Sequence, residues 1–263
     1  MSIVKNPIIP ISYEEHQKRH AEYHRAGSGD TAVLFVHGIL SSPAYFESIY
    51  PLVPENIHIE SILLPGHGKQ AVDFARATIW EWQSYVNGRL DALRARFDNI
   101  LLVGHSLGTL LLTCAAAQNP DKIRRMFLFN SPVYIEVSPR MLPMTLRAAF
   151  ALQDANNPMD VEAARVFSVH GRMIPEAALF AGNNMALLPK SAQTRKAAKK
   201  LTVPVTLIHS ANDEVVSGKS AKFWRKAGTN VIILPNSSHY FYDESDRPVL
   251  TKAFESFIKA SEM

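Results

Sequence analysis

A serine lies between two glycines in the segment VGHSLG, residues 103 to 108. Gly104 and Gly108 each stand two positions away from Ser106. A serine hydroxyl is a weak nucleophile unless a neighbouring base removes its proton. In a tight turn between a strand and a helix, side chains two positions before and after the serine would collide, so glycine is needed there. The spacing therefore predicts a nucleophilic serine, provided that a strand precedes it and a helix follows it.

A histidine and an aspartate far along the chain are the candidate partners of this serine. Among the ten histidines, His239 follows the last apolar run and comes after a suitable acid. That acid is Asp213, in the segment HSANDEVV, which we favour over its neighbour Glu214. Its carboxylate would accept the imidazole N–H, fix the tautomer and stabilise the imidazolium. The chain order of Ser106, Asp213 and His239 is the order that accompanies this kind of serine turn.

Two backbone amides are candidates for an oxyanion hole. Leu107 would lie at the N-terminus of the helix that follows the serine, where backbone N–H groups have no intrahelical partner. The loop HGIL after the first apolar run offers the amide of Ile39. Each such donor is worth roughly 3 kcal/mol in the transition state. Together with Ser106, these donors predict acyl transfer that needs neither a metal nor an organic cofactor.

Short apolar runs alternate with amphipathic segments along most of the chain. Continuous apolar runs that end at Gly, Pro or Asn indicate strands buried on both faces of a parallel sheet. Such a sheet brings the loops after its strands to one edge, where ligands bind. We therefore predict an α/β fold, a mostly parallel sheet with helices on both faces. The predicted strands are 32–36, 59–64, 99–103, 126–130, 203–208 and 230–234, and the predicted helices are 78–97, 106–118, 217–227 and 246–260.

One region interrupts the alternation. Residues 132–198 contain no convincing strand and are rich in methionine and phenylalanine, which form adaptable apolar walls. We predict a helical lid insertion in a single domain whose core comprises about 1–131 and 199–263. The alternative is that these side chains only pack the core of the insertion itself. They are Met141, Met144, Met159, Met173, Met185, Phe150, Phe167 and Phe180.

Composition excludes several classes of function. The net charge of +4 is too small and too scattered to indicate nucleic-acid binding. The densest basic run, residues 195–200, predicts a solvated helix face rather than a binding patch. The single cysteine, Cys114, forms no internal disulfide and is predicted to be a small buried core residue. Neither a signal peptide nor an apolar stretch long enough to span a bilayer is evident, so we predict a cytoplasmic protein without integral membrane association.

Three histidines near the N-terminus require a separate interpretation. His16, His20 and His24 recur at four-residue steps within residues 12–25, which we predict to be helical. Two such histidines can share a metal ion, but no carboxylate or cysteine is positioned to complete a site. We therefore predict a solvated helix face and no metal. The histidines in the loops near the serine turn are predicted to be structural, namely His37, His67 and His105.

The segments VHGIL, LPGHG, GHSLG, SANDEVV and SSHYF together resemble the serine hydrolases of the α/β-hydrolase superfamily. The compact layout is most similar to small bacterial carboxylesterases and monoacylglycerol lipases. The resemblance covers nearly the whole chain from residue 31 onward, apart from the insertion. One departure is that the superfamily usually begins with an antiparallel strand pair, whereas residues 12–25 look helical here. We therefore expect the sheet to be truncated at that end.

The resemblance implies a serine hydrolase that acts on a small-molecule ester with an apolar acyl group, through an acyl-enzyme. We expect butyrate-to-decanoate esters to react faster than acetate. A thioesterase, a C–C bond hydrolase or an S33-type peptidase would use the same triad and remain alternatives. A dehalogenase is disfavoured, because its chemistry requires aspartate where this chain has Ser106. A non-catalytic binding protein on the same fold is the alternative from a different class.

Overall fold

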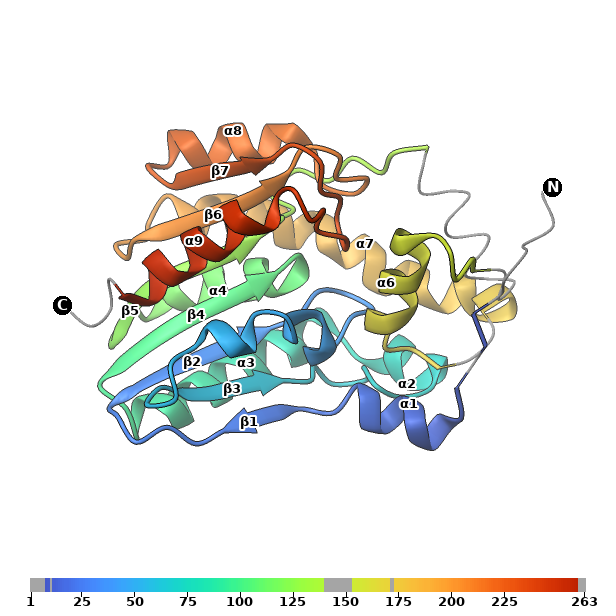
Figure 1. Ribbon diagram of the computed structural model, residues 1–263, viewed down its shortest axis with the longest axis horizontal. Coiled ribbons are helices and arrows are strands. Elements are labelled where there is room, and N and C mark those ends of the chain that lie inside the picture. The colour runs from blue at the N-terminus through green and yellow to red at the C-terminus, as the bar shows by residue number, and fades with distance from the viewer. Residues whose placement is uncertain (1–7, 10, 140–152, 171–172, 260–263) are drawn as a thin grey trace.

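The computed structural model describes residues 8, 9, 11–139, 153–170 and 173–259. Within these residues the chain forms a seven-stranded sheet in the order β1-β3-β2-β4-β5-β6-β7 (Figure 1). The β1 strand pairs antiparallel with β3, and all the other pairs are parallel. The strands are β1 (Tyr23–Arg25), β2 (Thr31–Val36), β3 (His58–Ile62), β4 (Asn99–His105), β5 (Ile123–Phe129), β6 (Val205–Ser210) and β7 (Asn230–Leu234).

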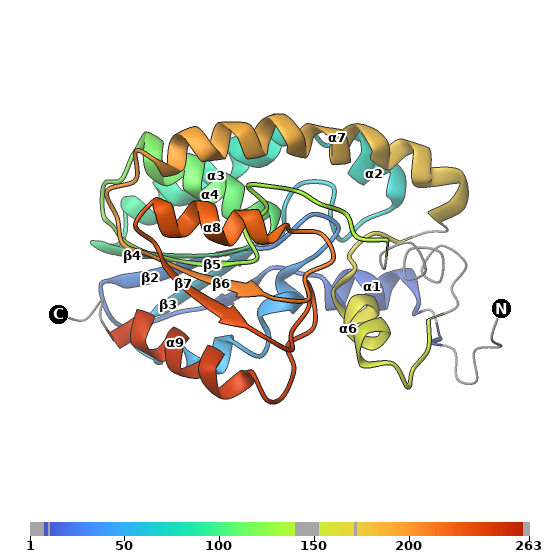
Figure 2. The same cartoon turned by 90° about the horizontal axis from the view of Figure 1, so that it is seen from above.

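Helices cover both faces of the sheet (Figure 2). One face carries α3, α4, α7 and α8, and the other carries α9 and two short 3-10 helices. The predicted α/β fold with helices on both faces is thereby confirmed. The helices are α1 (Tyr13–Arg19), α2 (Ala71–Arg76), α3 (Ile79–Arg94), α4 (Leu107–Gln118), α6 (Pro158–Val166), α7 (Met173–Ala198), α8 (Gly218–Lys226) and α9 (Arg247–Lys259), with 3-10 helices η1 (Pro43–Phe46) and η2 (Tyr50–Leu52).

The apolar runs become strands because both of their faces are buried. In β2, Leu34 faces one apolar layer and Phe35 the other, since successive side chains of a strand point to opposite faces. Both layers contain large side chains that are fully buried, such as Trp82 on one side and Phe254 on the other. All the strands predicted from apolar runs are present, and their bounds shift by a few residues at most.

The N-terminal segment differs from its prediction. Residues 12–25 are helical only in their first half, where Ser12 and Glu15 form a capping box at the start of α1. The chain then turns, and Tyr23–Arg25 pairs antiparallel with β3. Among the described residues, one short antiparallel strand therefore precedes β2 instead of the usual pair, so the sheet is shortened at that end, but by less than expected. A strand this short shows no alternation that sequence reading can detect. Its position is fixed by tertiary contacts, among them the bonds from the Arg25 guanidinium to two carbonyl groups of the loop before β3.

The segment between β5 and β6 contains the helices α6 and α7. Figure 1 shows α6 beside the edge of the sheet toward which the parallel strands point. Phe167 packs against the core, Met159 is half-buried, and Met185 is 69% exposed. The other apolar side chains expected to form the lid lie outside the described ones: Met141, Met144, Phe150, Met173 and Phe180.

Two local predictions have different outcomes. In the basic run, Lys196, Lys199 and Lys200 are exposed at the end of α7, as expected for a helix face in contact with solvent. Cys114 is half-buried rather than buried, and its sulfur lies 3.6 Å from the hydroxyl of Thr194 in α7. Within the described part of the chain, no helix is long and apolar enough to cross a membrane.

Candidate active site

The serine turn joins β4 to α4. Ser106 has φ 49° and ψ −118°, a strained conformation for a residue with a side chain, and it caps the N-terminus of α4. A Cβ on Gly108 would lie 2.0 Å from the carbonyl oxygen of Val36, and one on Gly104 would lie 3.0 Å from the amide of Thr109. Glycine is therefore required at position 108 for β2 and α4 to pack this closely, whereas a side chain at position 104 would require its neighbours to shift by a few tenths of an ångström.

Three side chains from separate loops form one hydrogen-bonded row. The hydroxyl of Ser106 lies 3.1 Å from Nε2 of His239, and Nδ1 of His239 lies 2.8 Å from Oδ2 of Asp213. The second carboxylate oxygen, Oδ1, accepts hydrogen bonds from the amides of Val215 and Val216 at 2.8 and 2.7 Å. Both Ser106 and His239 are almost fully buried. This arrangement leaves Nε2 free to accept a proton, because Nδ1–H donates to the carboxylate.

The neighbouring acid, Glu214, does not contact the imidazole ring. Its carboxylate accepts a hydrogen bond from the backbone amide of His239 at 3.2 Å. Burial raises the pKa of Glu214 above its usual range. Of the two acids that the sequence offers here, the structure therefore places Asp213 against the ring and Glu214 against the main chain of the same loop.

Asn130 is a supporting residue that sequence reasoning missed. Its side-chain amide donates to the carbonyl oxygens of Ser238 and His239 at 3.4 and 3.3 Å. Its side-chain oxygen accepts from the amide of Ser210 at 2.8 Å, so it links the ends of β5 and β6 to the histidine loop. The sequence signal is that the run MFLFN ends in asparagine, which tolerates the positive φ of 47° found here.

The loop after β2 passes directly beside the serine turn. A Cβ on Gly38 would lie 2.9 Å from the Cβ of Ser106, so only glycine permits this approach. The amides of Ile39 and Leu107 donate no hydrogen bond to any residue that the structure describes.

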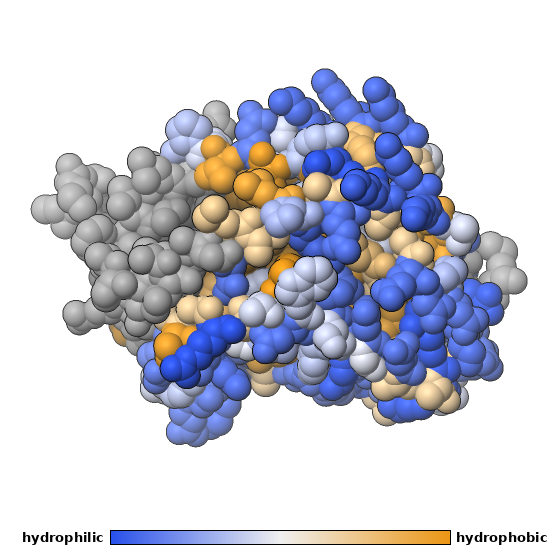
Figure 3. All heavy atoms as spheres, turned by 180° about the vertical axis from the view of Figure 1, so that it is seen from behind, coloured by the Kyte–Doolittle hydropathy of each residue, from blue (hydrophilic) through white to orange (hydrophobic). Residues whose placement is uncertain are grey.

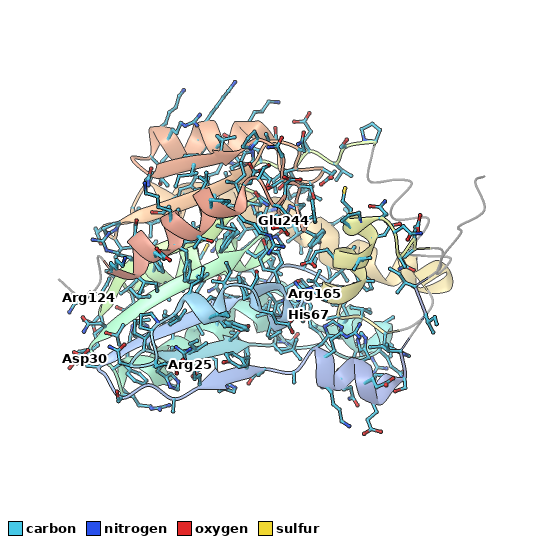
Figure 4. All side chains as sticks on the ribbon, viewed as in Figure 1. Arg25, Asp30, His67, Arg124, Arg165 and Glu244 are labelled. Carbon is cyan, nitrogen blue, oxygen red and sulfur yellow. The ribbon has the colours of Figure 1, made fainter. Side chains whose placement is uncertain are left out.

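Two buried histidines hold this loop. Nδ1 of His37 donates to the carbonyl of Gly38 at 2.8 Å, and its Nε2 accepts from the amide of Leu64 at 3.0 Å. Nε2 of His67 accepts from the amide of Leu40 at 3.2 Å. Burial lowers the pKa of His67 to about 4 and that of His37 well below its usual value, so both are neutral acceptors near pH 7. Figure 4 shows His67 near the carboxyl ends of the parallel strands, whereas Asp30 lies at the opposite end of the sheet.

The predicted solvated face of the N-terminal helix was wrong, because His20 packs against the loop after β2 and His16 against the segment after α6. Nδ1 of His20 lies 2.7 Å from the hydroxyl of Ser42, and Nε2 of His16 donates to the carbonyl of Ser168 at 3.0 Å. Both histidines are buried, and burial lowers the pKa of His20 to about 3. His24 lies apart from them, exposed in β1. Among the described residues, no group of three or more His, Cys, Asp or Glu side chains could hold a metal ion.

Aromatic rings pack against His239 and against the neighbouring His105. Tyr45 stacks on His105 with ring centroids 3.8 Å apart, and Tyr240 meets His239 edge-on at 4.7 Å. Nε2 of His105 in turn donates to the carbonyl of His239 at 3.2 Å. Tyr45 and Tyr240 also line a cavity of about 550 Å³, together with Arg165 of α6. Together with these contacts, the burial of His239 leaves its side chain almost without exposed surface.

The comparisons with known proteins agree with this architecture. The model of the alpha/beta hydrolase family matches residues 33–252, which is most of the chain. A 2-(acetamidomethylene)succinate hydrolase of Mesorhizobium japonicum is 26% identical over 89% of this chain and 90% of its own length. An (E)-2-((N-methylformamido)methylene)succinate hydrolase of Acinetobacter baylyi is 29% identical, but there the match spans 47% of this chain and less than half of that relative, 46%.

Solved structures resemble the chain over nearly its full length. A structure from work on LipS and LipT, two metagenome-derived lipolytic enzymes, superposes with a TM-score of 0.68 at 21% identity, covering 92% of this chain and 98% of its own. The thioesterase domain from the curacin biosynthetic pathway superposes with a TM-score of 0.57 at 19% identity, covering 89% and 94%. At these identities the likeness shows the fold alone.

Proposed function

We propose, from the premise that the chain belongs to the alpha/beta hydrolase family, that it is a serine hydrolase of carboxylic esters. Ser106 is the nucleophile, His239 the general base and Asp213 the acid that orients it. The observation that carries this proposal is the unbroken row of hydrogen bonds through the three side chains, 3.1 Å and 2.8 Å long. The strained backbone of Ser106 supports it, because strain of this kind concentrates at functional residues.

In the first step, Nε2 of His239 takes the proton of Ser106 while the serine oxygen attacks the ester carbonyl. Negative charge then develops on the carbonyl oxygen, and the free amides of Ile39 and Leu107 donate hydrogen bonds to it. The carboxylate of Asp213 stabilises the imidazolium that forms. Its position is maintained by the amides of Val215 and Val216.

In the second step, the tetrahedral intermediate collapses and the imidazolium gives its proton to the leaving alcohol. A water molecule then loses a proton to His239 and attacks the acyl-enzyme carbonyl, and the same two amides hold the oxyanion again. The acid is released and the Ser106 hydroxyl is regenerated. All the proton transfers pass through one imidazole nitrogen, so these residues need no cofactor for the reaction.

We also propose that the insertion, residues 132–198, forms a lid over the acyl group of the substrate. The core of the single domain then comprises about residues 1–131 and 199–263. Two contacts support a position beside the reacting atoms. The amide of Ser168 donates to the carbonyl of Leu40 at 2.9 Å, within the loop that offers the Ile39 amide. Arg165 donates to the carbonyl of Ala44, so α6 is attached to the same loop region. An apolar lid there favours acyl chains from butyrate to decanoate.

A second candidate is hydrolysis of an amide-like or thioester bond by the same three residues. The relative that matches along 90% of its length is a 2-(acetamidomethylene)succinate hydrolase, which favours including that compound as a substrate. Thioesterase, C–C bond hydrolase and peptidase activities remain alternatives, and a binding protein without catalysis is the alternative from a different class.

The test is a panel of p-nitrophenyl esters from acetate to decanoate, with an acyl thioester, an aminoacyl amide and 2-(acetamidomethylene)succinate measured beside them. We expect kcat/KM to be greatest for an ester between butyrate and decanoate. Ser106→Ala should lower kcat by more than about 10⁴-fold without changing the circular dichroism spectrum. A maximum at acetate would overturn the acyl preference, and a larger kcat/KM for a non-ester substrate would replace the ester with that class.

A further inference from the structure

A second concave site lies on the face of the molecule that carries α3, α4 and α7. It is a groove of about 610 Å³ between these three helices. Figure 2 shows α7 running across α3 and α4 on that face, and Figure 3 shows the same side as mainly hydrophilic. The groove reaches Cys114, about two helical turns along α4 from Ser106, so it is separate from the proposed active site.

The charged side chains that line the groove are all positive. Three lysines line it, Lys190, Lys196 and Lys200, and none of the described residues in its wall is acidic. No carboxylate of the described part of the chain forms an ion pair with any of the three. A concave surface lined by charges of one sign concentrates ligands of the opposite sign. The groove therefore suits an anionic ligand.

Lys190 differs from the other two lysines because it is buried. The residue is 5% exposed, and its Nζ donates to the side-chain oxygens of Gln83 and Gln193. Burial lowers the pKa of Lys190. Burying a charge that has only neutral acceptors costs free energy, and an anion bound beside it would offset part of that cost.

The residue types indicate which anion fits. The described wall contains lysines but no arginine, so it offers point charges rather than the planar fork that selects carboxylates. Trp80 stands at the same groove with 73% of its surface exposed. An exposed indole provides a flat apolar surface on which a planar ring can stack. Phosphate charge and a planar ring together describe a nucleotide-like phosphate ester.

We propose that the groove between α3, α4 and α7 binds a phosphate ester with a planar ring, its phosphates along the wall that contains Lys190, Lys196 and Lys200 and its ring on Trp80. This site goes beyond the proposed hydrolase function, and its test is direct binding. Catalysis therefore does not enter the readout, and failure of either proposal leaves the other standing.

The experiment uses the fluorescence of the full-length protein, titrated with ADP at low ionic strength. The chain has three tryptophans, and Trp82 and Trp224 are fully buried, so a change in emission reports Trp80. We expect a saturable change with a Kd of about 1 mM or lower. Adenosine and inorganic pyrophosphate, which each lack one half of the ligand, should bind at least about tenfold more weakly.

Lys190→Met is the decisive variant, because it keeps the length of the side chain and removes the buried charge. It should fold with equal or greater stability, since replacing a buried charge with an apolar group is often neutral or favourable. ADP affinity should fall at least about tenfold in Lys190→Met and in Lys196→Met, and stay unchanged in Lys252→Met, on the exposed side of α9. No saturable change with ADP, or equal affinity in Lys190→Met, would overturn the site. Equal binding of pyrophosphate would overturn the role of Trp80.

Discussion

At the scale of single residues, the two adjacent acids Asp213 and Glu214 make different contacts with His239. Asp213 reaches the imidazole Nδ1 and has its other oxygen occupied by two amides, whereas Glu214 binds the backbone amide of the histidine. A general base must keep one nitrogen free and hold the correct tautomer. Asp213, which contacts the imidazole ring, is therefore the acid that we expect to affect the tautomer. Glu214, which contacts the backbone of His239, is expected to affect only the position of the loop.

This division predicts different outcomes for two isosteric substitutions. Asp213→Asn should lower kcat by about 10³- to 10⁴-fold, because an amide in place of the carboxylate favours the wrong imidazole tautomer. Glu214→Gln, the matched control, should lower kcat by no more than about tenfold, because it keeps an acceptor for the His239 amide. Steady-state kinetics on the preferred ester give both values. Equal losses in the two variants would contradict the assignment.

Ser106, Asp213 and His239 could be predicted from the sequence, because their residue types, their order along the chain and the apolar runs beside them are typical of such a site. Asn130, His16 and His20 could not, because their roles depend on which segments become neighbours in space. Asn130 acts through the loop that holds His239, about a hundred positions further along the chain. The histidines of α1 act through Ser42 and Ser168, and a four-residue spacing indicates a shared helix face without saying what covers it.

At the scale of elements, the close packing of β2, β4 and α4 determines the serine turn. The backbone of Gly108 lies against the carbonyl of Val36, so the distance between the strand and the helix is set by the absence of one carbon atom. The loop after β2 approaches Ser106 in the same way at Gly38. Close packing alone therefore accounts for glycine at position 108 of the G-x-S-x-G pattern.

Gly108→Ala should destabilise the protein by about 3 kcal/mol or more and abolish esterase activity, because the added Cβ overlaps the Val36 carbonyl. The control is Gly88→Ala in the exposed part of α3, where an added Cβ meets nothing within 4 Å. That change should stabilise by about 0.5–1 kcal/mol, because alanine favours the helix more than glycine does. Urea unfolding measures both free energies. A Gly108→Ala protein of unchanged stability and activity would contradict the packing argument.

Most elements could be predicted because a parallel sheet buried on both faces leaves continuous apolar runs. Among the strands, the exception is β1, which has three residues and an exposed edge, and its register comes from pairing Tyr23 with Ser61 rather than from its own pattern. The short helices α2, η1 and η2 were not predicted either. The bounds of α6 and α7 were also beyond sequence reading. Their helical character was predictable, but the bond from Ser168, between the two helices, to Leu40 in the loop after β2 depends on contacts between distant segments.

At the scale of the whole molecule, buried neutral histidines connect the fold to pH. His20 and His67 have pKa values lowered by burial to about 3 and about 4, and both hold the loop after β2. In the unfolded chain the same side chains titrate near 6.5. Between these values the unfolded state binds more protons than the native state, so stability falls as pH falls. Above about pH 6.5 both histidines are neutral in the native and the unfolded state, so they do not lower the free energy of unfolding there.

The free energy of unfolding should therefore change little between pH 7 and 8 and should decline from about pH 6.5 toward pH 4. In His67→Gln, which keeps an acceptor for the Leu40 amide, the slope over that window should be smaller by up to about 1.4 kcal/mol per pH unit. Urea unfolding at several pH values measures this. A slope unaffected by His67→Gln would contradict the effect of burial.

Reaction with a fluorophosphonate, followed by mass spectrometry of the digested protein, tests whether Ser106 is an activated nucleophile. The reagent requires a serine whose proton is removed by a base, so the three-residue row predicts one adduct per chain, on the peptide that contains Ser106. Ser106→Ala should take up no reagent, and His239→Gln should react more slowly by at least about 10³-fold. An unlabelled protein, or an adduct on a different serine, would contradict the proposed hydrolase.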